Sequence, residues 1–238
     1  EAYKSSLVPY KADGEINFNG SISGLANKEN HPDIRVEYKI EGATFTHLAS
    51  GIAMSDINAS GSFEKENGKP EKLAIAACTA DFESGTFSTS GIVAEFARPW
   101  IDLELSGNFD LSDLRQFADL EAVDELNGQF VLNCHFEGKI EDPSSITKKD
   151  LDNAKVGGEM QFTDALFHLK GAPHAFDNLS GKFSLSNKNA TIHEFAGTVE
   201  ESDFALDGIF SNFLPFLLIA EEGLSIDARF SSNHLDFN

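Results

Sequence analysis

Apolar and polar residues alternate with a period of two through much of this chain, and this pattern restricts the fold more than any other sequence feature. Phe183 and Leu185, for example, alternate with Lys182 and Ser184. Because successive side chains of a β-strand point to opposite faces, such segments form strands with one apolar and one polar face, as in antiparallel sheets. The same alternation is found in residues 16–22, 34–40, 87–93, 101–109, 130–136 and 224–230. We therefore predict a mainly β fold built on an elongated, curved antiparallel sheet.

Helical patterns are few and short. Ser112–Leu126 has an N-capping serine followed by apolar residues at three-residue steps, so we predict a helix near 112–126. Ser211–Ala220 is apolar, and we predict a short helix there because Pro215 falls in its first turn, where proline is tolerated. The polar segment Asp142–Ala154 is expected to form a loop or a single helical turn.

The chain contains an internal repeat. Asp56–Val93 matches Phe176–Phe213 in the order of its glycines, serines and phenylalanines, with about three extra residues in the first copy near Lys69, and the period is about 120 residues. We predict a duplicated sheet unit. The first unit is assigned to residues 1–138, including the helix near 112–126, and the second to residues 139–238. Both are expected to be parts of one continuous sheet in a fragment of a longer protein.

Charge and aromatic composition exclude some classes of partner. The chain has 39 acidic and 18 basic residues, a formal net charge of −21, which argues against binding to nucleic acid or to anionic membrane surfaces. It has 21 Phe but only 3 Tyr and 1 Trp, and Phe is the aromatic residue suited to a wholly apolar surface. No segment approaches the roughly 18 apolar residues that span a bilayer, so any membrane tether is expected outside this fragment.

Residue patterns typical of catalysis or metal binding were not found. The seven histidines are scattered, and no phosphate-binding or dinucleotide-binding motif is present. We therefore predict no catalytic residues, no metal site and no cofactor, and we expect that the protein is not an enzyme. Cys78 and Cys134 fit no metal or redox spacing; buried free thiols are the favoured interpretation, and a disulfide is the alternative.

Strands with one apolar face form a sheet whose apolar face must either be covered by other parts of the protein or bind an apolar ligand. A second sheet or a helix can cover it, giving an ordinary dry core, or the sheet can curl into a trough that holds an apolar ligand. Repeated strand units in series extend a sheet, which favours the trough, and an acyl chain is the ligand that suits a groove without polar anchors. The candidate lipid-binding residues are Phe183, Leu185, Phe204, Leu206, Phe210, Ile226 and Phe230. The alternative is a duplicated structural or adhesion module with a dry core and no lipid ligand.

The second copy also resembles a known family. Asn178, Gly181 and Phe183, followed by Gly197 to Gly208 and a final strand ending at Leu235-Asp236, are similar to the C-terminal β-repeat region of AsmA-like proteins, which are related to TamB and to bridge-like lipid-transfer proteins. The first copy departs from the pattern, with Ala80 in the place of Gly197. The resemblance implies a β-groove protein of the Gram-negative periplasm, anchored to the inner membrane in its full-length form. It also implies phospholipid binding or transfer and a role in outer-membrane homeostasis, with envelope proteins as further partners.

Overall fold

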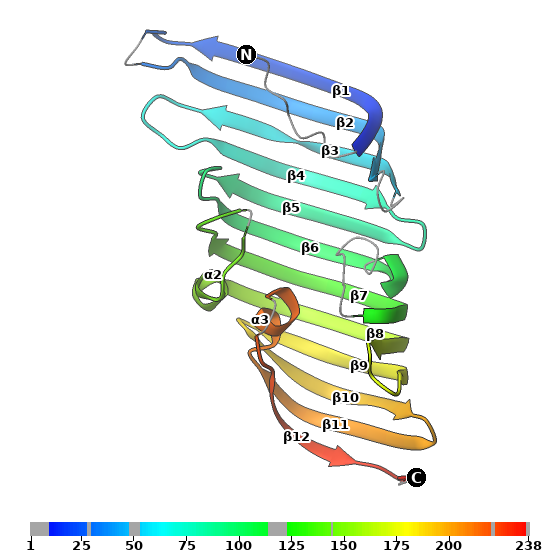
Figure 1. Cartoon of the computed structure of the whole chain (residues 1–238). Coiled ribbons are helices and arrows are strands. Elements are labelled where there is room, and N and C mark those ends of the chain that lie inside the picture. Colours follow the sequence, from blue (N-terminus) through cyan, green and yellow to red (C-terminus); the bar gives the residue numbers. More distant parts are fainter. Residues whose placement is uncertain are drawn as a thin grey trace.

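Twelve antiparallel strands form one open sheet in which each strand pairs with its neighbours in the sequence (Figure 1). This computed structural model describes residues 10–27, 30–47, 53–113, 123–143, 145–219 and 222–236. The strands are β1 (Tyr10–Ser23), β2 (Asp33–His47), β3 (Ala53–Lys65), β4 (Lys72–Asp81), β5 (Thr86–Ala94), β6 (Trp100–Asp110), β7 (Val123–Lys139), β8 (Lys155–Leu169), β9 (Phe176–Ser186), β10 (Asn189–Val199), β11 (Ser202–Ser211) and β12 (Ser225–Ser231). The predicted mainly β, antiparallel fold is confirmed.

Besides the helical residues 111–113, the described residues include two short helices. Helix α2 (Lys148–Asn153) follows β7, and Thr147 and Asp150 form a reciprocal capping box at its start. Helix α3 (Phe213–Leu218) follows β11 and has Pro215 in its first turn, as the sequence predicted.

The helix predicted near 112–126 is wrong over its last four residues. Residues 111–113 are helical and 114–122 lie outside the described residues, but Val123–Leu126 belongs to β7. Leu126 pairs with Phe167 of β8 and is buried, so cross-strand pairing and burial outweigh the local helical pattern.

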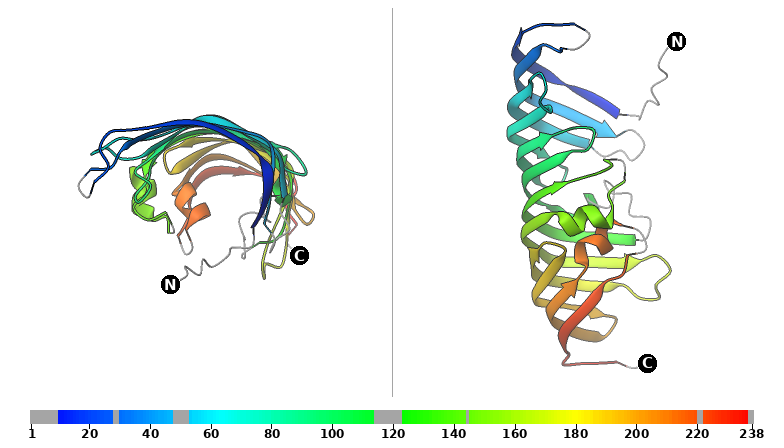
Figure 2. Two further views of the ribbon diagram at one scale, coloured as in Figure 1. Left: turned by 90° about the horizontal axis from the view of Figure 1, so that it is seen from above. Right: turned by 90° about the vertical axis from the view of Figure 1, so that its left-hand side faces the viewer.

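The sheet is bent into an arch, and both helices lie on its concave side (Figure 2). Phe213 of α3 stacks on Phe183 of β9, with ring centroids 6.0 Å apart, so the face that carries Phe183 is the concave one. Directly paired residues of neighbouring strands share a face, and the register therefore assigns every strand residue to the concave or the convex side. Tracing the pairs from Phe183 across the sheet places the apolar row of each strand on the concave side.

Bulges change the alternation at several positions without breaking the apolar face. The unpaired backbone N–H groups of Gly42, Asp164 and Glu194 lie at three such bulges, and each of these residues has a positive φ. A side chain of the adjacent strand accepts each N–H: Asn58 Oδ1 at 3.1 Å, Ser180 Oγ at 3.1 Å and Asp207 Oδ1 at 3.0 Å, respectively. These hydrogen bonds satisfy the donors that each bulge would otherwise leave without a partner.

The bulges also show how the two halves of the sheet correspond. The shift between Ile40 and Ala43 in β2 recurs in β8 between Phe162 and Ala165, 122 residues later, and Asn58 and Ser180 accept the bulge N–H groups at the same separation. The shift between Ile75 and Cys78 in β4 recurs in β10, 117 residues later. Strands β2–β6 therefore correspond to β8–β12. Between these two bulges the first copy is five residues longer than the second, rather than about three.

Glycine is required where the strands approach closely. Gly91 in β5 has φ +139°, and a Cβ atom there would lie 2.0 Å from the carbonyl oxygen of Asp102. A Cβ atom added at Gly157 in β8 would have no other atom within 4 Å, and the φ of Gly157 lies outside the left-handed region.

We predict that Gly91→Ala lowers the free energy of unfolding by about 1–3 kcal/mol, because the strand must shift to admit the methyl group. Gly157→Ala is the matched control and should be neutral or stabilising by about 0.4–1 kcal/mol. Urea denaturation followed by circular dichroism measures both. Equal effects of the two substitutions would contradict the predicted close approach at Gly91.

Asp203 at the start of β11 holds the segment that follows β12. Its carboxylate accepts hydrogen bonds from the backbone N–H of His234 at 2.6 Å, from Ser232 Oγ at 2.8 Å and from the backbone N–H of Asn233 at 2.9 Å. These donors, the His234 N–H foremost, lower the pKa of Asp203 from 3.8 to about 2.

Because the folded pKa is lowered, the stabilisation by Asp203 is present above about pH 4 and is lost as the pH falls through about 2. We predict that Asp203→Asn lowers the thermal midpoint at pH 5, and that the difference from the wild type shrinks at pH 2.5. Differential scanning calorimetry at the two pH values tests this. A difference that is constant between them would mean that the charge of Asp203 contributes nothing.

Candidate functional site

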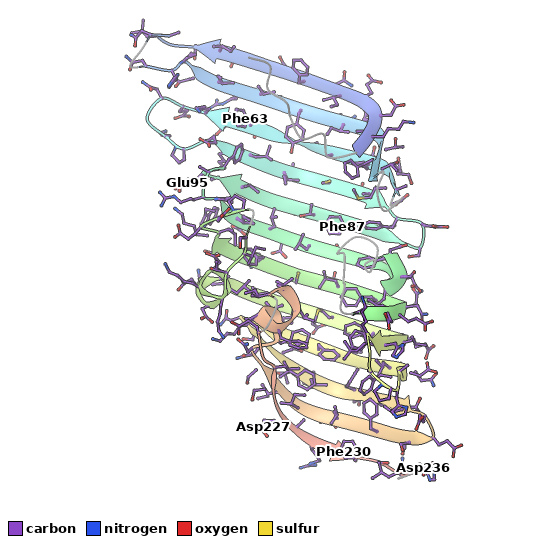
Figure 3. The ribbon with its side chains drawn as sticks, viewed as in Figure 1. Phe63, Phe87, Glu95, Asp227, Phe230 and Asp236 are labelled. Carbon is purple, nitrogen blue, oxygen red and sulfur yellow. The ribbon has the colours of Figure 1, made fainter. Side chains whose placement is uncertain are left out.

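The concave face is apolar from one edge strand of the sheet to the other. In the first half of the sheet it carries Ile16, Phe18, Ile22, Ile34, Val36, Tyr38, Ile40, Phe63, Leu73, Ile75, Cys78, Phe87, Thr89, Val93, Ile101, Leu103, Leu105 and Phe109. In the second half it carries Phe130, Leu132, Cys134, Phe136, Val156, Met160, Phe162, Phe183, Leu185, Ile192, Phe195, Phe204, Leu206, Phe210, Ile226 and Phe230. None of the residues in these two sets is charged, although Lys65 at the end of β3 also lies on this face, because it pairs with Ile34. Figure 3 shows Phe63 of β3, Phe87 of β5 and Phe230 of β12 on this side of the sheet.

The few polar groups among these residues are directed to the sheet backbone or kept neutral. The hydroxyl of Tyr38 donates to the carbonyl oxygen of Ala74 at 3.3 Å, and that of Thr89 donates to the carbonyl oxygen of Glu104 at 2.8 Å. Burial raises the pKa of the thiols of Cys78 and Cys134, so both are uncharged at neutral pH. This floor therefore contacts a ligand almost entirely through hydrocarbon.

Both cysteines are free, as the favoured interpretation of the sequence held. They are half-buried rather than buried. Cys134 pairs with Leu105 across the sheet, which places it on the apolar face.

Phenylalanine rings form a chain of contacts along the second half of the concave face. Phe109, Phe130, Phe162 and Phe183 lie on four consecutive strands, and their ring centroids are 5.5, 4.9 and 5.3 Å apart in turn. Phe183 also contacts Phe210, at 6.3 Å. Such tilted and edge-on pairs stabilise the sheet by more than their buried area alone.

The seven predicted lipid-binding residues all lie on the concave face, but their exposure differs. Phe183, Leu185 and Phe210 are buried, and Phe204 and Leu206 are half-buried. Ile226 and Phe230 of the edge strand β12 are each 55% exposed. The structure thus brings the seven together on one surface, where the first three form its packed floor and the last two are open to solvent.

The opposite edge strand has the same character. Phe18 of β1 is 77% exposed, and its neighbours Ile16 and Ile22 on the same face are also largely exposed. Large apolar side chains are thus uncovered at both edges of the sheet, and contiguous exposed apolar surface usually marks a site of interaction.

An apolar hollow of about 280 Å³ lies where α3 approaches the concave face. Strands β7–β11, helix α3 and Leu111 line it. All of the lining residues are apolar: Leu111, Leu126, Phe130, Met160, Phe162, Ala165, Phe167, Leu179, Phe183, Phe195, Phe210, Phe213 and Leu217. Of the residues predicted from the sequence, only Phe183 and Phe210 are among them.

The convex face is polar and carries ion pairs between neighbouring strands. Arg35 Nε lies 3.1 Å from Glu64, and Lys155 Nζ lies 3.1 Å from Glu137. His135 Nε2 lies 2.7 Å from Asp102, and the hydrogen bond to that carboxylate raises the pKa of His135. The convex face is therefore hydrophilic, in contrast to the apolar concave face. Among the described residues, no three of His, Cys, Asp and Glu converge in a way that would hold a metal ion.

Sequence reasoning missed several residues of the concave face. Phe195 was not predicted because the bulge between Ile192 and Phe195 reverses the alternation that starts at Ile192. The available sequence signal was Glu194, a charged residue in the middle of the strand. In the structure, its positive φ marks the bulge. Phe109, Phe130 and Phe162 also lie on this face but were not among the predicted lipid-binding residues.

Comparison with known proteins gave no match to a family model, to a curated protein or to a solved structure. In the described part of the chain, no helix has the length and apolar character needed to cross a membrane. Inference about function therefore depends on the geometry and chemistry of the concave face.

The burial of Phe183 and the exposure of Phe18 give a direct test of which part of the face is packed. Phe183 is 4% exposed, and we predict that Phe183→Ala lowers the free energy of unfolding by about 3–5 kcal/mol through loss of packing. Phe18→Ala, at 77% exposure, should change it by less than about 1 kcal/mol. Guanidinium denaturation measures both. A small effect at Phe183 would contradict the packed floor.

Proposed function

We propose that this chain is a non-enzymatic β-groove segment that binds the acyl chains of lipids, phospholipids in particular, along its concave face. The observation that carries the proposal is the unbroken apolar face from β1 to β12, with exposed Phe18 at one edge and exposed Phe230 at the other. A dry structural module would be expected to cover such residues.

Simple energetics support an acyl chain as the ligand. Burial of each methylene contributes on the order of 0.8 kcal/mol, so a chain of about sixteen carbons gains enough to offset the cost of association without polar anchors. Because the contacts are weak and repeated, a bound chain can move along the floor. The acidic net charge of −21 disfavours a partner that is bound through its phosphates, such as nucleic acid.

The resemblance of the second copy to AsmA-like proteins supports the same proposal. On this proposal the full-length protein acts in the periplasm of a Gram-negative cell, tethered to the inner membrane, with a role in phospholipid movement and outer-membrane homeostasis. A duplicated structural or adhesion module with a dry core is the competing proposal, and it is favoured by the packed Phe cluster around Phe183 in the second half of the sheet.

Phe230 and Ile209 provide a matched pair for testing the groove. They are similarly exposed, at 55% and 47%, but Phe230 lies on the concave face and Ile209 on the convex face, since Ile209 pairs with Asp227 while Phe230 pairs with Leu206. We predict that Phe230→Asp weakens binding of a fluorescent polyene fatty acid several-fold, because a carboxylate on the floor must be desolvated. Ile209→Asp should bind like the wild type.

Fluorescence titration measures the affinities, and the thermal midpoint checks that both variants are folded. Equal weakening by the two substitutions would contradict a role for the concave face. A wild-type protein that binds neither the fatty acid nor a dye for apolar surfaces would favour the structural module.

A further inference from the structure

Helix α3 belongs to a segment of the second copy that has no counterpart in the first. The corresponding strands β5 and β6 are joined by residues 95–99, whereas β11 and β12 are joined by residues 212–224, which include α3. The longer connection turns back over the concave face, where Phe213 contacts Phe183 (Figure 2). The two halves of the floor therefore differ, because α3 lies over the second and has no counterpart in the connection between β5 and β6.

Polar contacts on the rim hold the α3 connection in place. Lys148 of α2 forms an ion pair with Glu222 at 2.6 Å, and Asn212 Nδ2 donates to the carbonyl oxygen of Gly223 at 2.7 Å. The backbone N–H of Leu214 donates to the carbonyl oxygen of Lys188 at 3.1 Å. The helix is thus anchored at the edge of the arch, so its position does not require the space beneath it to be filled.

The space bounded by α3 has the size and chemistry of an alkyl-chain site. Its volume of about 280 Å³ is nearly twice that of a cavity of about 150 Å³ that holds benzene, so it has room for about a dozen carbon atoms. All of its lining residues are apolar, which excludes a headgroup or a carboxylate from it. Leu217 of α3 lines the hollow and is 49% exposed, so it lies where the hollow meets solvent.

We propose that this hollow is a holding site for the methyl end of a single alkyl chain, whether from a free fatty acid or from a phospholipid. The rest of the chain lies along the open part of the concave face, and the carboxyl or headgroup end stays outside the hollow. The first half of the sheet then serves as an open track, and the second half as the place where a chain end is retained. This inference rests on the proposed function of the concave face and adds a defined position to it.

Photo-crosslinking tests the position of the chain end. Two palmitic acid probes are used, one with a diazirine near the methyl end and one with a diazirine near the carboxyl, together with a phosphatidylethanolamine that carries the first of these chains. Labelled peptides are then mapped by mass spectrometry. The methyl-end probes should label β7–β10 and α3, and the carboxyl-end probe should label residues outside the hollow.

Leu217→Glu and Leu218→Glu form a matched pair of variants. Both residues lie on α3 and are similarly exposed, at 49% and 56%, but only Leu217 lines the hollow. Leu217→Glu should reduce methyl-end labelling of β7–β10 about tenfold, because it places a charge at the mouth of an apolar site. Leu218→Glu should leave labelling unchanged, and Leu217→Trp, which narrows the mouth without adding a charge, should also reduce it.

Each outcome bears on the inference. Methyl-end labelling confined to β1–β6 in the wild type would overturn the holding site but leave lipid binding by the concave face intact. Equal labelling of β7–β10 in the Leu217→Glu and Leu218→Glu variants would also overturn it. Absence of labelling by every probe would overturn the proposed function itself. A free fatty acid that labels α3 while the phospholipid does not identifies the free acid as the source of the chain.

Discussion

Strand register is the constraint on which the rest of this structure depends. A shift of one residue in a single strand would move its whole apolar row to the convex side, because side chains alternate with a period of two. The apolar rows stay on the concave side across the bulges, and at three of them a side chain of the neighbouring strand accepts the extra N–H group. At the bulge in β10, Glu194 has a positive φ, and the carboxylate of Asp207 on the neighbouring strand accepts the backbone N–H group of Glu194. The hydrogen-bonding register of the sheet therefore determines that the apolar side chains share one face.

A continuous apolar face on an open sheet poses a problem that a closed fold does not have. The sheet bends into an arch, which brings the rings of the second half into contact, and α3 covers part of that half (Figure 2). The first half has no helix above it among the described residues. Its edge residue Phe18 therefore remains exposed, and the proposed lipid ligand accounts for this uncovered surface.

The sequence predicted the features that depend on local pattern. The alternating rows identified strands such as β2 and β6, and the position of Pro215 predicted α3, because both signals act within a few residues. The helix predicted to reach Leu126 was wrong over Val123–Leu126, since β8 offers that segment a pairing partner which the local pattern does not reveal. In the predicted repeat, the alignment of β3 was displaced by two positions relative to the bulges.

The candidate site was predictable only in part, for a similar reason. Phe183 and Phe210 were identified from alternation in their own strands. Phe195 and Leu217 were not, because the first reaches the concave face through a bulge and the second through the placement of α3 across the sheet. Contacts of this kind are fixed by the tertiary arrangement, so a pattern within one strand does not contain them.

The central claim is that lipid acyl chains occupy the concave face, and native mass spectrometry of the protein purified from cells tests it most directly. The account predicts masses above that of the bare chain that match bound phospholipid or fatty acid, and organic extraction should recover the same molecules. Repeated observation of the bare chain alone, in preparations that remain folded, would contradict it.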